Sequence, residues 1–464
     1  MPINSFLLPG AKVTTGYDVD NSCRFFSDTS LHKDNGGSAT NRDKYTFSFW
    51  YKKCANGVDQ KIIMVSGSGT QGDGADDYMQ GYFKSDDTFR WQEYDTDLGS
   101  PSDELVTTQV FRDNTAWMHF VLRFDSTSGT ADDRMRIYVN GTQVTAFGTR
   151  ANPDQNIDGW FGDTDAGIAI GGVSSQFCNG YLAEVVGVDG QSLAPTEFGE
   201  FSEDSPNIWI PKNVSGITLG NNGFYLDFKD SANLGNDAGG GTDFSEVNLA
   251  AADQATDTPT NNFCVINPLA SNVTLSEGNL QFSGYYNCKS SIAMQNGKWY
   301  AECKITNDNT YNPMTGIGQT GTEHIDNPLG DGYAGNTTDS YHYQRDGKIH
   351  ANGSEDAQTS LTSIAQNDIV GIAVDLDSGT KTCKWYINNT LRATQNLSET
   401  GSNPYVFWTY ASGSQAGEGQ WNFGGCSAFT VSSAQSDANG YGNFEYAPPS
   451  GYYALCTKNL AEFG

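Results

Sequence analysis

The sequence predicts an all-β protein built from two β-sandwich domains in tandem. Three observations carry this prediction: aromatic and turn-forming residues are abundant, short alternating strands recur between turns, and one hairpin pattern occurs twice. The chain has 464 residues, which is too long for a single hydrophobic core. Its 25 Phe, 23 Tyr and 9 Trp suit half-buried strands, and its 53 Gly suit tight turns.

The first strands are predicted from strict alternation of apolar residues. Residues 45–51 place four aromatic side chains on one face, and residues 117–124 place Met118, Phe120, Leu122 and Phe124 together. A strand over 134–139 leads into Asn140-Gly141, which is the strongest short hairpin signal. Further strands are expected over 168–170 and 181–186.

The middle of the chain is less regular. Residues 192–198 begin with Ser and carry Pro195 in the first turn, so a helix of one or two turns is expected there. Residues 203–262 contain one strand-like piece and a stretch rich in Gly, Asp and Ala. Because this segment keeps aromatic residues, we expect a connector packed along the domains. The predicted parts are an N-terminal arm over 1–17, a first domain over 18–202, the connector over 203–262 and a second domain over 263–464.

The second domain shows strands of the same kind, over 298–305, 340–344, 368–375, 383–387 and 405–410. One pattern from the first domain recurs here. A strand, an Asp-bearing Ser-Gly-Thr turn, a strand and an Asn-led hairpin occur over 124–142 and again over 374–390. Gly129 and Gly379 of the two turns are 250 residues apart, and Tyr138 and Tyr386 of the following strands are 248 residues apart. We therefore predict that both domains share one architecture, with their hairpins in corresponding places.

Charge and cysteine content exclude several function classes. The net charge is −29, and no basic run is present, so nucleic-acid binding is not expected. No apolar run approaches the ~18 residues of a membrane span. The nine cysteines are scattered and form no CxxC pair, so reduced buried thiols are expected rather than disulfides or a zinc site. That suits assembly in a bacterial cytoplasm.

Several motifs resemble a known family. Val19-Asp-Asn-Ser-Cys-Arg-Phe-Phe, Tyr45-Thr-Phe-Ser-Phe-Trp and Gly180-Tyr-Leu-Ala-Glu-Val are similar to a concanavalin A-like, LamG-type lectin domain. With Asp257-Thr-Pro-Thr-Asn-Asn-Phe, they resemble structural and tail-fibre proteins of marine tailed phages. In those proteins a SPRY domain follows the lectin domain, and Gly297-Lys-Trp-Tyr-Ala-Glu with Gly371-Ile-Ala-Val-Asp is similar to SPRY.

The resemblance implies a virion protein: a fibre, a spike or a capsid decoration protein that presents lectin-like domains to host-surface polysaccharide. It implies other virion proteins and further copies of the chain as partners, and a place on the virion surface. A purely structural cement protein is the second hypothesis. The third is a glycan hydrolase that uses Glu93 and Asp95. These two and Asp97 share one face of a strand, as the carboxylates of β-glucanases do.

Binding is favoured over catalysis. Sugars stack on flat aromatic rings, so the loop residues Trp160, Tyr311 and Tyr333, each near Asn, Asp or Gly, are the candidate ligand-binding residues. No cofactor and no metal ligand is assigned, although LamG-type domains often hold calcium, and acidic turns occur at Asp73, Asp76 and Asp77 and at Asp154, Asp158, Asp163 and Asp165. The arm carries one apolar cluster, Phe6-Leu7-Leu8, which is the candidate anchor to a virion partner.

Overall fold

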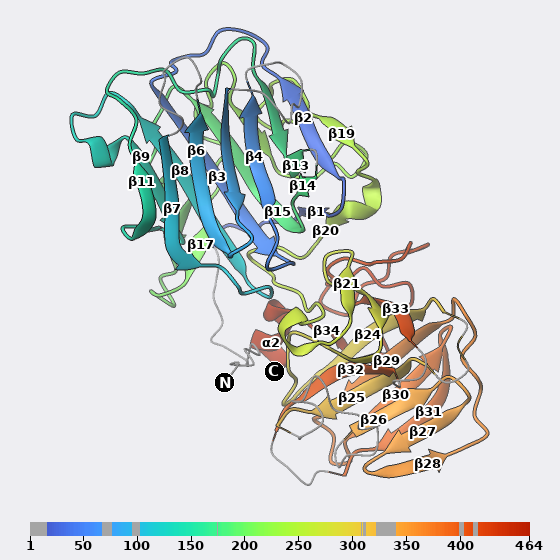
Figure 1. Cartoon of the computed structure of the whole chain (residues 1–464). Helices are drawn as coiled ribbons and strands as arrows, with labels where there is room; N and C mark the ends of the chain where they lie inside the picture. The colour runs from blue at the N-terminus through green and yellow to red at the C-terminus, as the bar shows by residue number, and fades with distance from the viewer. Residues whose placement is uncertain are drawn as a thin grey trace. The chain divides into compact units, whose positions relative to one another are not determined.

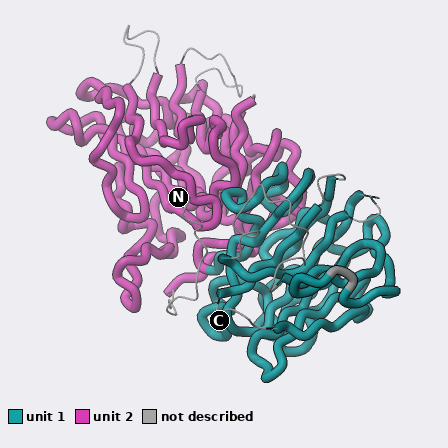
Figure 2. Tube along the Cα trace, turned by 60° about the horizontal axis from the view of Figure 1, so that its bottom comes forward, with its two compact units in different colours: residues 1–12, 261–464 teal, residues 13–260 magenta. Residues whose placement is uncertain are grey.

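A computed structural model describes residues 16–66, 77–94, 103–173, 175–307, 309, 312–321, 340–398, 403–411 and 416–464. The chain divides into two compact units, which are numbered here in chain order. The first unit ends at residue 260 (magenta in Figure 2), and the second runs from residue 261 to 464 (teal). Each unit contains two large β-sheets (Figure 1). The prediction of an all-β chain of sandwich domains is therefore confirmed.

In the first unit the strands of one sheet, here called the back sheet, are ordered β10-β9-β8-β3-β15-β1-β20, with β18 added beside β15. Their bounds are β1 (Ser22–Phe25), β3 (Lys44–Lys53), β8 (Trp117–Asp125), β9 (Met135–Val139), β10 (Thr142–Gln143), β15 (Gly180–Asp189), β18 (Phe224–Leu226) and β20 (Gln254–Ala255).

The opposing front sheet of the first unit has the order β11-β7-β6-β5-β4-β12-β2-β19. Its strands are β2 (Ser30–Asp34), β4 (Gln60–Ser66), β5 (Tyr78–Phe83), β6 (Thr88–Tyr94), β7 (Asp103–Val110), β11 (Phe147–Ala151), β12 (Gly167–Ile170) and β19 (Ser245–Val247). Small hairpins β13 (Gly172–Val173) with β14 (Gln176–Phe177) and β16 (Gly199–Phe201) with β17 (Trp209–Pro211) stand outside these sheets.

The core of the first unit lies between its two sheets. Phe47 and Phe120 from the back sheet and Phe89 and Trp91 from the front sheet belong to one buried cluster. The rings of Phe89 and Phe120 meet across the layers at 4.9 Å. Aromatic contacts of this kind add to the burial of apolar area that closes the sandwich.

The segment expected to be a connector belongs to the first sandwich instead. Within it β18 pairs with β15, β19 pairs with β2 and β20 pairs with β1. Apolar residues of this segment and of its approach also cover the outer face of the back sheet, in a cluster with Val121 and Val186. The helix predicted over 192–198 is a single 3₁₀ turn, Pro195–Glu197.

The second unit has a back sheet ordered β21-β22-β33-β24-β29-β30-β31, with β34 beside β24. These strands are β21 (Thr274–Ser276), β22 (Gln281–Gly284), β24 (Lys298–Ile305), β29 (Ile369–Asp375), β30 (Thr382–Ile387), β31 (Thr390–Asn396), β33 (Gly417–Asn422) and β34 (Tyr453–Ala454). Its front sheet, β23-β32-β25-β26-β27-β28, comprises β23 (Tyr286–Lys289), β25 (Met314–Gln319), β26 (Ser340–Gln344), β27 (Lys348–Ala351), β28 (Ser354–Gln358) and β32 (Tyr405–Ala411).

The remaining elements are short. They are the 3₁₀ turns η1 (Ala131–Asp133), η3 (Ala251–Asp253) and η4 (Pro268–Ala270), and the helix α2 (Thr457–Phe463) close to the C-terminus. The sequence did not lead us to expect α2. Among the residues described, no helix is long and apolar enough to cross a membrane. All nine cysteines are buried with free thiols.

The two units share one strand topology. Six back-sheet strands, β10-β9-β8-β3-β15-β1, correspond in order and in chain sequence to β31-β30-β29-β24-β33-β22. Six front-sheet strands, β7-β6-β5-β4-β12-β2, correspond likewise to β28-β27-β26-β25-β32-β23. The prediction that both domains have one architecture is confirmed, and the two Asn-led hairpins join corresponding strands.

The shared hairpin is built by the same hydrogen bonds in both units. Asn140 donates its N–H to the His119 carbonyl at 2.9 Å and accepts the His119 N–H on Oδ1 at 2.8 Å. Asn388 forms the same two bonds with Ile369, each at 3.0 Å. Both asparagines have φ of 46°, a left-handed conformation that asparagine tolerates better than most residues. A local sequence signal therefore determines the same turn twice.

In each unit the first and the last residues of the sandwich lie next to each other. In the first unit Val19 donates its N–H to Thr260 Oγ1 at 3.0 Å. In the second unit Asn262 donates its N–H to Thr457 Oγ1 at 3.0 Å, and Thr457 donates its N–H back to the Asn262 carbonyl at 3.0 Å. The start and the end of each sandwich are thus hydrogen-bonded to each other.

Candidate functional site

The candidate site is a hollow at one end of the first sandwich, here called the rim hollow. It has a volume of about 310 Å³ and is lined by Ser38, Ala39, Arg42, Asp158, Gly162 and Thr164. These residues come from two loops: the one between β2 and β3, and the one between β11 and β12. Loops at the end of a rigid sandwich are a common place for binding residues.

Hydrogen bonds hold the β2–β3 loop in place. Asp189, at the end of β15, accepts the N–H groups of Thr40 at 2.8 Å and of Asn222 at 3.1 Å. The amide of Asn222 in turn donates to the Gly37 carbonyl at 2.9 Å. The β2–β3 loop, which supplies Ser38, Ala39 and Arg42 to the lining, is therefore held by buried polar groups, and such preorganisation lowers the entropy lost on binding.

Arg42 is the basic residue in the lining of the rim hollow, and several contacts hold its side chain in place. Its Nε donates to the Gly159 carbonyl at 3.0 Å, and Nη1 pairs with Asp163 at 2.7 Å and approaches Asp158 at 3.8 Å. Its guanidinium also lies over the Trp160 ring, 5.9 Å from the ring centroid. The Nε–H bond, the ion pair at Nη1 and the ring contact orient the guanidinium through separate groups, which a lysine ammonium does not offer.

Of the sequence-predicted ligand residues, Trp160 lies next to the rim hollow, beside Arg42, but it is not one of the residues that line it. The loop that carries it supplies Asp158, Gly162 and Thr164 to the lining, and part of its own ring packs on the core. Tyr311 and Tyr333 lie outside the described residues, as do Phe6, Leu7 and Leu8 of the arm. Arg42 was not predicted from the sequence, because it is 118 residues away from Trp160 and only the fold brings the two side chains together.

The candidate catalytic carboxylate Glu93 faces the interior. It follows the inward-facing Phe89 and Trp91 on β6, and it is only 6% exposed. Its carboxylate accepts the Tyr45 hydroxyl, and Oε2 accepts the Trp160 N–H at 3.3 Å. Burial raises the pKa of Glu93 well above its usual range. Asp95 and Asp97 lie outside the described residues.

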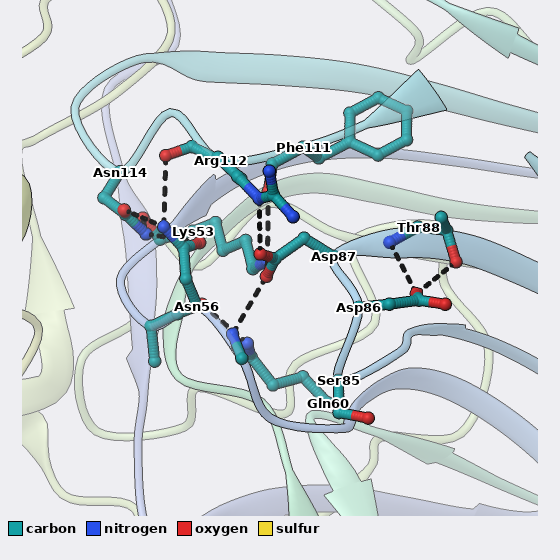
Figure 3. Close-up of polar contacts among 12 residues, drawn as sticks. Lys53, Asn56, Gln60, Ser85, Asp86, Asp87, Thr88, Phe111, Arg112 and Asn114 are labelled. Atoms are coloured by element: carbon teal, nitrogen blue, oxygen red, sulfur yellow. Dashed lines mark hydrogen bonds and ion pairs between the residues drawn. The ribbon is translucent and has the colours of Figure 1, made fainter. Parts of the chain in front are cut away.

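At the opposite end of the sandwich another cluster of charges is satisfied within the protein (Figure 3). Lys53 donates to Asp87 Oδ1 at 2.7 Å and to the Phe111 carbonyl at 3.0 Å, and Arg112 donates to Asp87 Oδ2 at 2.9 Å. Gly57 adds its N–H to Asp87 at 3.0 Å. This network joins three loops and holds Lys53 fully buried, so it acts in folding rather than in binding.

No group of three or more His, Cys, Asp or Glu side chains is placed to hold a metal ion among the residues that the structure covers. Among these residues, the carboxylates of Asp154, Asp158, Asp163 and Asp165 therefore do not come together as a set of metal ligands. Asp158 and Asp163 instead face Arg42.

Comparison with known proteins supports the lectin-type fold. Residues 27–191 match a laminin G-type family model described as the concanavalin A-like lectin/glucanases superfamily. This match lies inside the first domain predicted from the sequence, and it confirms the concanavalin A-like content of that domain. No curated protein matches the chain in sequence.

Solved structures show more distant likeness. A SAP-like pentraxin from Limulus polyphemus is 17% identical, with 39% of this chain and 80% of that chain covered and a TM-score of 0.28. The SPRY domain of human HERC1 is 18% identical, with 36% and 99% covered and a TM-score of 0.28. The CBM40 module of a Ruminococcus gnavus sialidase, bound to sialyllactose, is 17% identical, with 36% and 95% covered and a TM-score of 0.25. With TM-scores this low, none of them assigns a ligand to this chain.

Proposed function

We propose that this chain is a phage virion protein whose first unit binds host-surface glycans at the rim hollow. The observation that carries the binding role is the oriented Arg42 beside Trp160 and Asp158 in an open hollow. A guanidinium donates hydrogen bonds to sugar hydroxyls, a carboxylate accepts them, and an indole ring packs on sugar C–H groups. Among the described residues that line the hollow there is no nucleophile–base pair, and Glu93 is buried in the core, so we favour binding without hydrolysis.

The virion role rests on the order of the sequence motifs and on charge. The motifs that resemble tail-fibre and structural proteins of marine phages run through both units in the expected order. A net charge of −29 keeps many copies apart and soluble on a crowded particle surface. Both sandwiches close their own cores, so the segment that would attach them to other virion proteins is the arm over residues 1–17.

Replacing Asp158 by asparagine is expected to weaken glycan binding about ten-fold, because a hydrogen bond to a charged group contributes about 1.5–3 kcal/mol and one between neutral groups about 0.5–1.5 kcal/mol, and a difference of about 1.4 kcal/mol is ten-fold. The Asp158 side chain is 61% exposed, so the fold is not expected to change. The measurement is a glycan array with the full chain, followed by titration of the best neutral and acidic oligosaccharides by calorimetry.

Asp165→Asn is the matched control, since Asp165 is an exposed carboxylate of the same loop that does not line the hollow. Its affinity should equal that of the unchanged chain. An array without any bound glycan, or equal affinities for Asp158→Asn and Asp165→Asn, would contradict glycan binding at the rim hollow.

Deleting residues 2–15 is expected to abolish incorporation into particles while leaving both sandwiches folded. The reason is that the arm carries an apolar cluster but too few residues to form a core, so these apolar side chains would be buried by binding to a partner. The copy number in purified particles is measured by quantitative mass spectrometry. Incorporation at the normal copy number would place the attachment elsewhere and favour a sandwich face.

A further inference from the structure

The β16–β17 hairpin of the first unit carries an exposed surface that is both apolar and acidic. The side chains of Phe201 and Ile208 are 48% and 45% exposed. Between them in sequence lie Glu203 and Asp204, which are exposed as well. Among the residues described, Glu203 makes no ion pair. We call residues 201–208 the acidic hairpin (light green, labelled β17 in Figure 1).

The acidic hairpin is held firmly on its unit. Trp209 is buried, and its Nε1 donates to His119 Nδ1 of β8 at 2.9 Å. Its ring also lies so close to Gly141 that a Cβ atom there would collide with it. The Phe201 ring meets the Trp209 ring edge-on, with centroids 5.0 Å apart. The exposed phenyl ring is therefore fixed in place, which lowers the entropy lost when a partner covers it.

The β30–β31 hairpin of the second unit has the opposite charge. Residues 378–398 contain three basic residues and no acidic residue, in a chain whose net charge is −29. Leu391 is 50% exposed, and Arg392 next to it is exposed too. Arg392 lies at an irregularity of the β30–β31 pairing. We call residues 384–392 the basic hairpin.

The basic and apolar groups of this hairpin share its outer surface. On β30 the side chains of Cys383 and Trp385 are fully buried in the core, so Lys384 and Tyr386 point outward. Leu391 lies opposite Tyr386 in the register and therefore faces outward with it. The part of the chain that the structure describes gives neither Lys384 nor Arg392 an ion-pair partner. Their positive charge is thus available to a carboxylate from outside the unit.

The two hairpins complement each other in charge and both expose large apolar side chains. Contact between two acidic hairpins, or between two basic hairpins, would bring like charges together, which costs free energy. Contact between an acidic and a basic hairpin neutralises both, and it covers Phe201, Ile208 and Leu391 at the same time. Elsewhere on so acidic a chain, a second copy meets repulsion.

We infer that the acidic hairpin of one copy of this chain binds the basic hairpin of a second copy. Glu203 and Asp204 pair with Lys384 and Arg392, and the apolar side chains pack beside these pairs. Because the contact joins two different surfaces, each bound copy keeps one unused hairpin and can bind a third copy. The copies therefore form a row or a ring rather than a closed dimer. This contact is independent of glycan binding and goes beyond the proposed function.

Sedimentation velocity of the full chain tests the inference. A contact limited to two hairpins is small and therefore weak, so the chain is studied from about 5 to about 500 μM. The average mass should rise with concentration and pass that of a dimer, and about 0.5 M NaCl should reduce this rise. A sample that keeps the mass of a single chain at every concentration would overturn the inference.

Charge reversal identifies the two surfaces. The double variant Glu203→Lys with Asp204→Lys has two basic hairpins, and the double variant Lys384→Glu with Arg392→Glu has two acidic ones. Each variant alone should associate about ten-fold or more weakly than the unchanged chain. An equimolar mixture of the two should associate again, because every contact between unlike chains then joins opposite charges. A mixture that associates no better than either variant alone would contradict the assignment of these hairpins.

Leu391→Asp tests the apolar part of the contact, and it should also weaken association about ten-fold or more. Leu269→Asp is the matched control, because Leu269 is 49% exposed in the same unit but lies outside both hairpins. Glu418→Lys, at an exposed position of β33, controls for the change in net charge. Both controls should associate like the unchanged chain, and circular dichroism melting shows that every variant is folded. Equal association of Leu391→Asp and Leu269→Asp would exclude Leu391 from the contact and count against the inference.

Discussion

Asp87→Asn is expected to destabilise the first sandwich by about 3–5 kcal/mol at pH 7, because it leaves the Lys53 ammonium buried without its carboxylate. Lys53 is fully buried and Asp87 is nearly so. The substitution keeps the shape of the side chain. Asparagine also tolerates the left-handed φ of 65° at this position, so backbone strain does not enter the comparison.

The loss should shrink as the pH rises. Burial already lowers the pKa of Lys53, and Asp87 acts against that effect. Without the carboxylate, burial should lower the pKa of Lys53 further, whereas the unfolded chain keeps this lysine protonated up to about pH 10. The unfolded state then binds more protons than the native state, so the stability of the variant should rise with pH, by at most about 1.4 kcal/mol per pH unit.

Urea unfolding of Asp87→Asn and of the unchanged chain, followed at pH 7, 8 and 9, measures both effects. The neighbouring Asp86 supplies the control. Its side chain is 56% exposed, it accepts a hydrogen bond from Thr88 (Figure 3), and it pairs with Lys84 at the surface. Asp86→Asn is expected to cost less than about 1 kcal/mol. Equal losses for the two variants, or a loss that does not depend on pH, would show that Lys53 does not need its partner.

Glu184→Gln is expected to stabilise the first unit by up to about 3 kcal/mol at pH 8 and to have little effect at pH 5. Burial raises the pKa of Glu184 to about 7, against the bonds that its carboxylate accepts from Tyr225 at 2.8 Å and Tyr17 at 3.2 Å. The folded pKa therefore exceeds the unfolded value. The native state binds the extra proton, and stability is lost as the pH rises from about 4.5 to 7.

Glutamine imitates the protonated acid, so it should remove this part of the pH dependence. Thermal unfolding at pH 5, 6, 7 and 8 gives the difference between the variant and the unchanged chain. Glu200→Gln, at an exposed position of β16, is the control and should show a constant small difference. A difference between Glu184→Gln and the unchanged chain that stays flat from pH 5 to 8 would mean that Glu184 is ionised in the folded protein throughout.

Local signals explain why the fold could be predicted. The hairpins at Asn140 and Asn388 follow from residues adjacent in sequence, and alternation defined the long strands β3, β8 and β29. The role of residues 203–262 could not be predicted in this way. Its strands have only two or three residues and are defined by pairing with β1, β2 and β15, far back in the chain.

The candidate site was predicted only in part for the same reason. Trp160 could be chosen from its loop composition, but Arg42 is its neighbour only because β3 and the β11–β12 loop meet at one end of the sandwich. Glu93 was assigned to a carboxylate face, whereas alternation with Phe89 and Trp91 turns it inward.

The bonds that join the start of each sandwich to its end have a genetic consequence. A segment whose two ends meet can be copied, removed or inserted into a loop of another protein without stretching the host backbone. Each unit is a segment of this kind, since Val19 is bonded to Thr260 in the first and Asn262 to Thr457 in the second. One duplication of the gene segment that encodes a unit, followed by sequence divergence in its loops, is sufficient to produce two units with the same strand order. Recombination among related genes can then exchange one unit while the other keeps its fold.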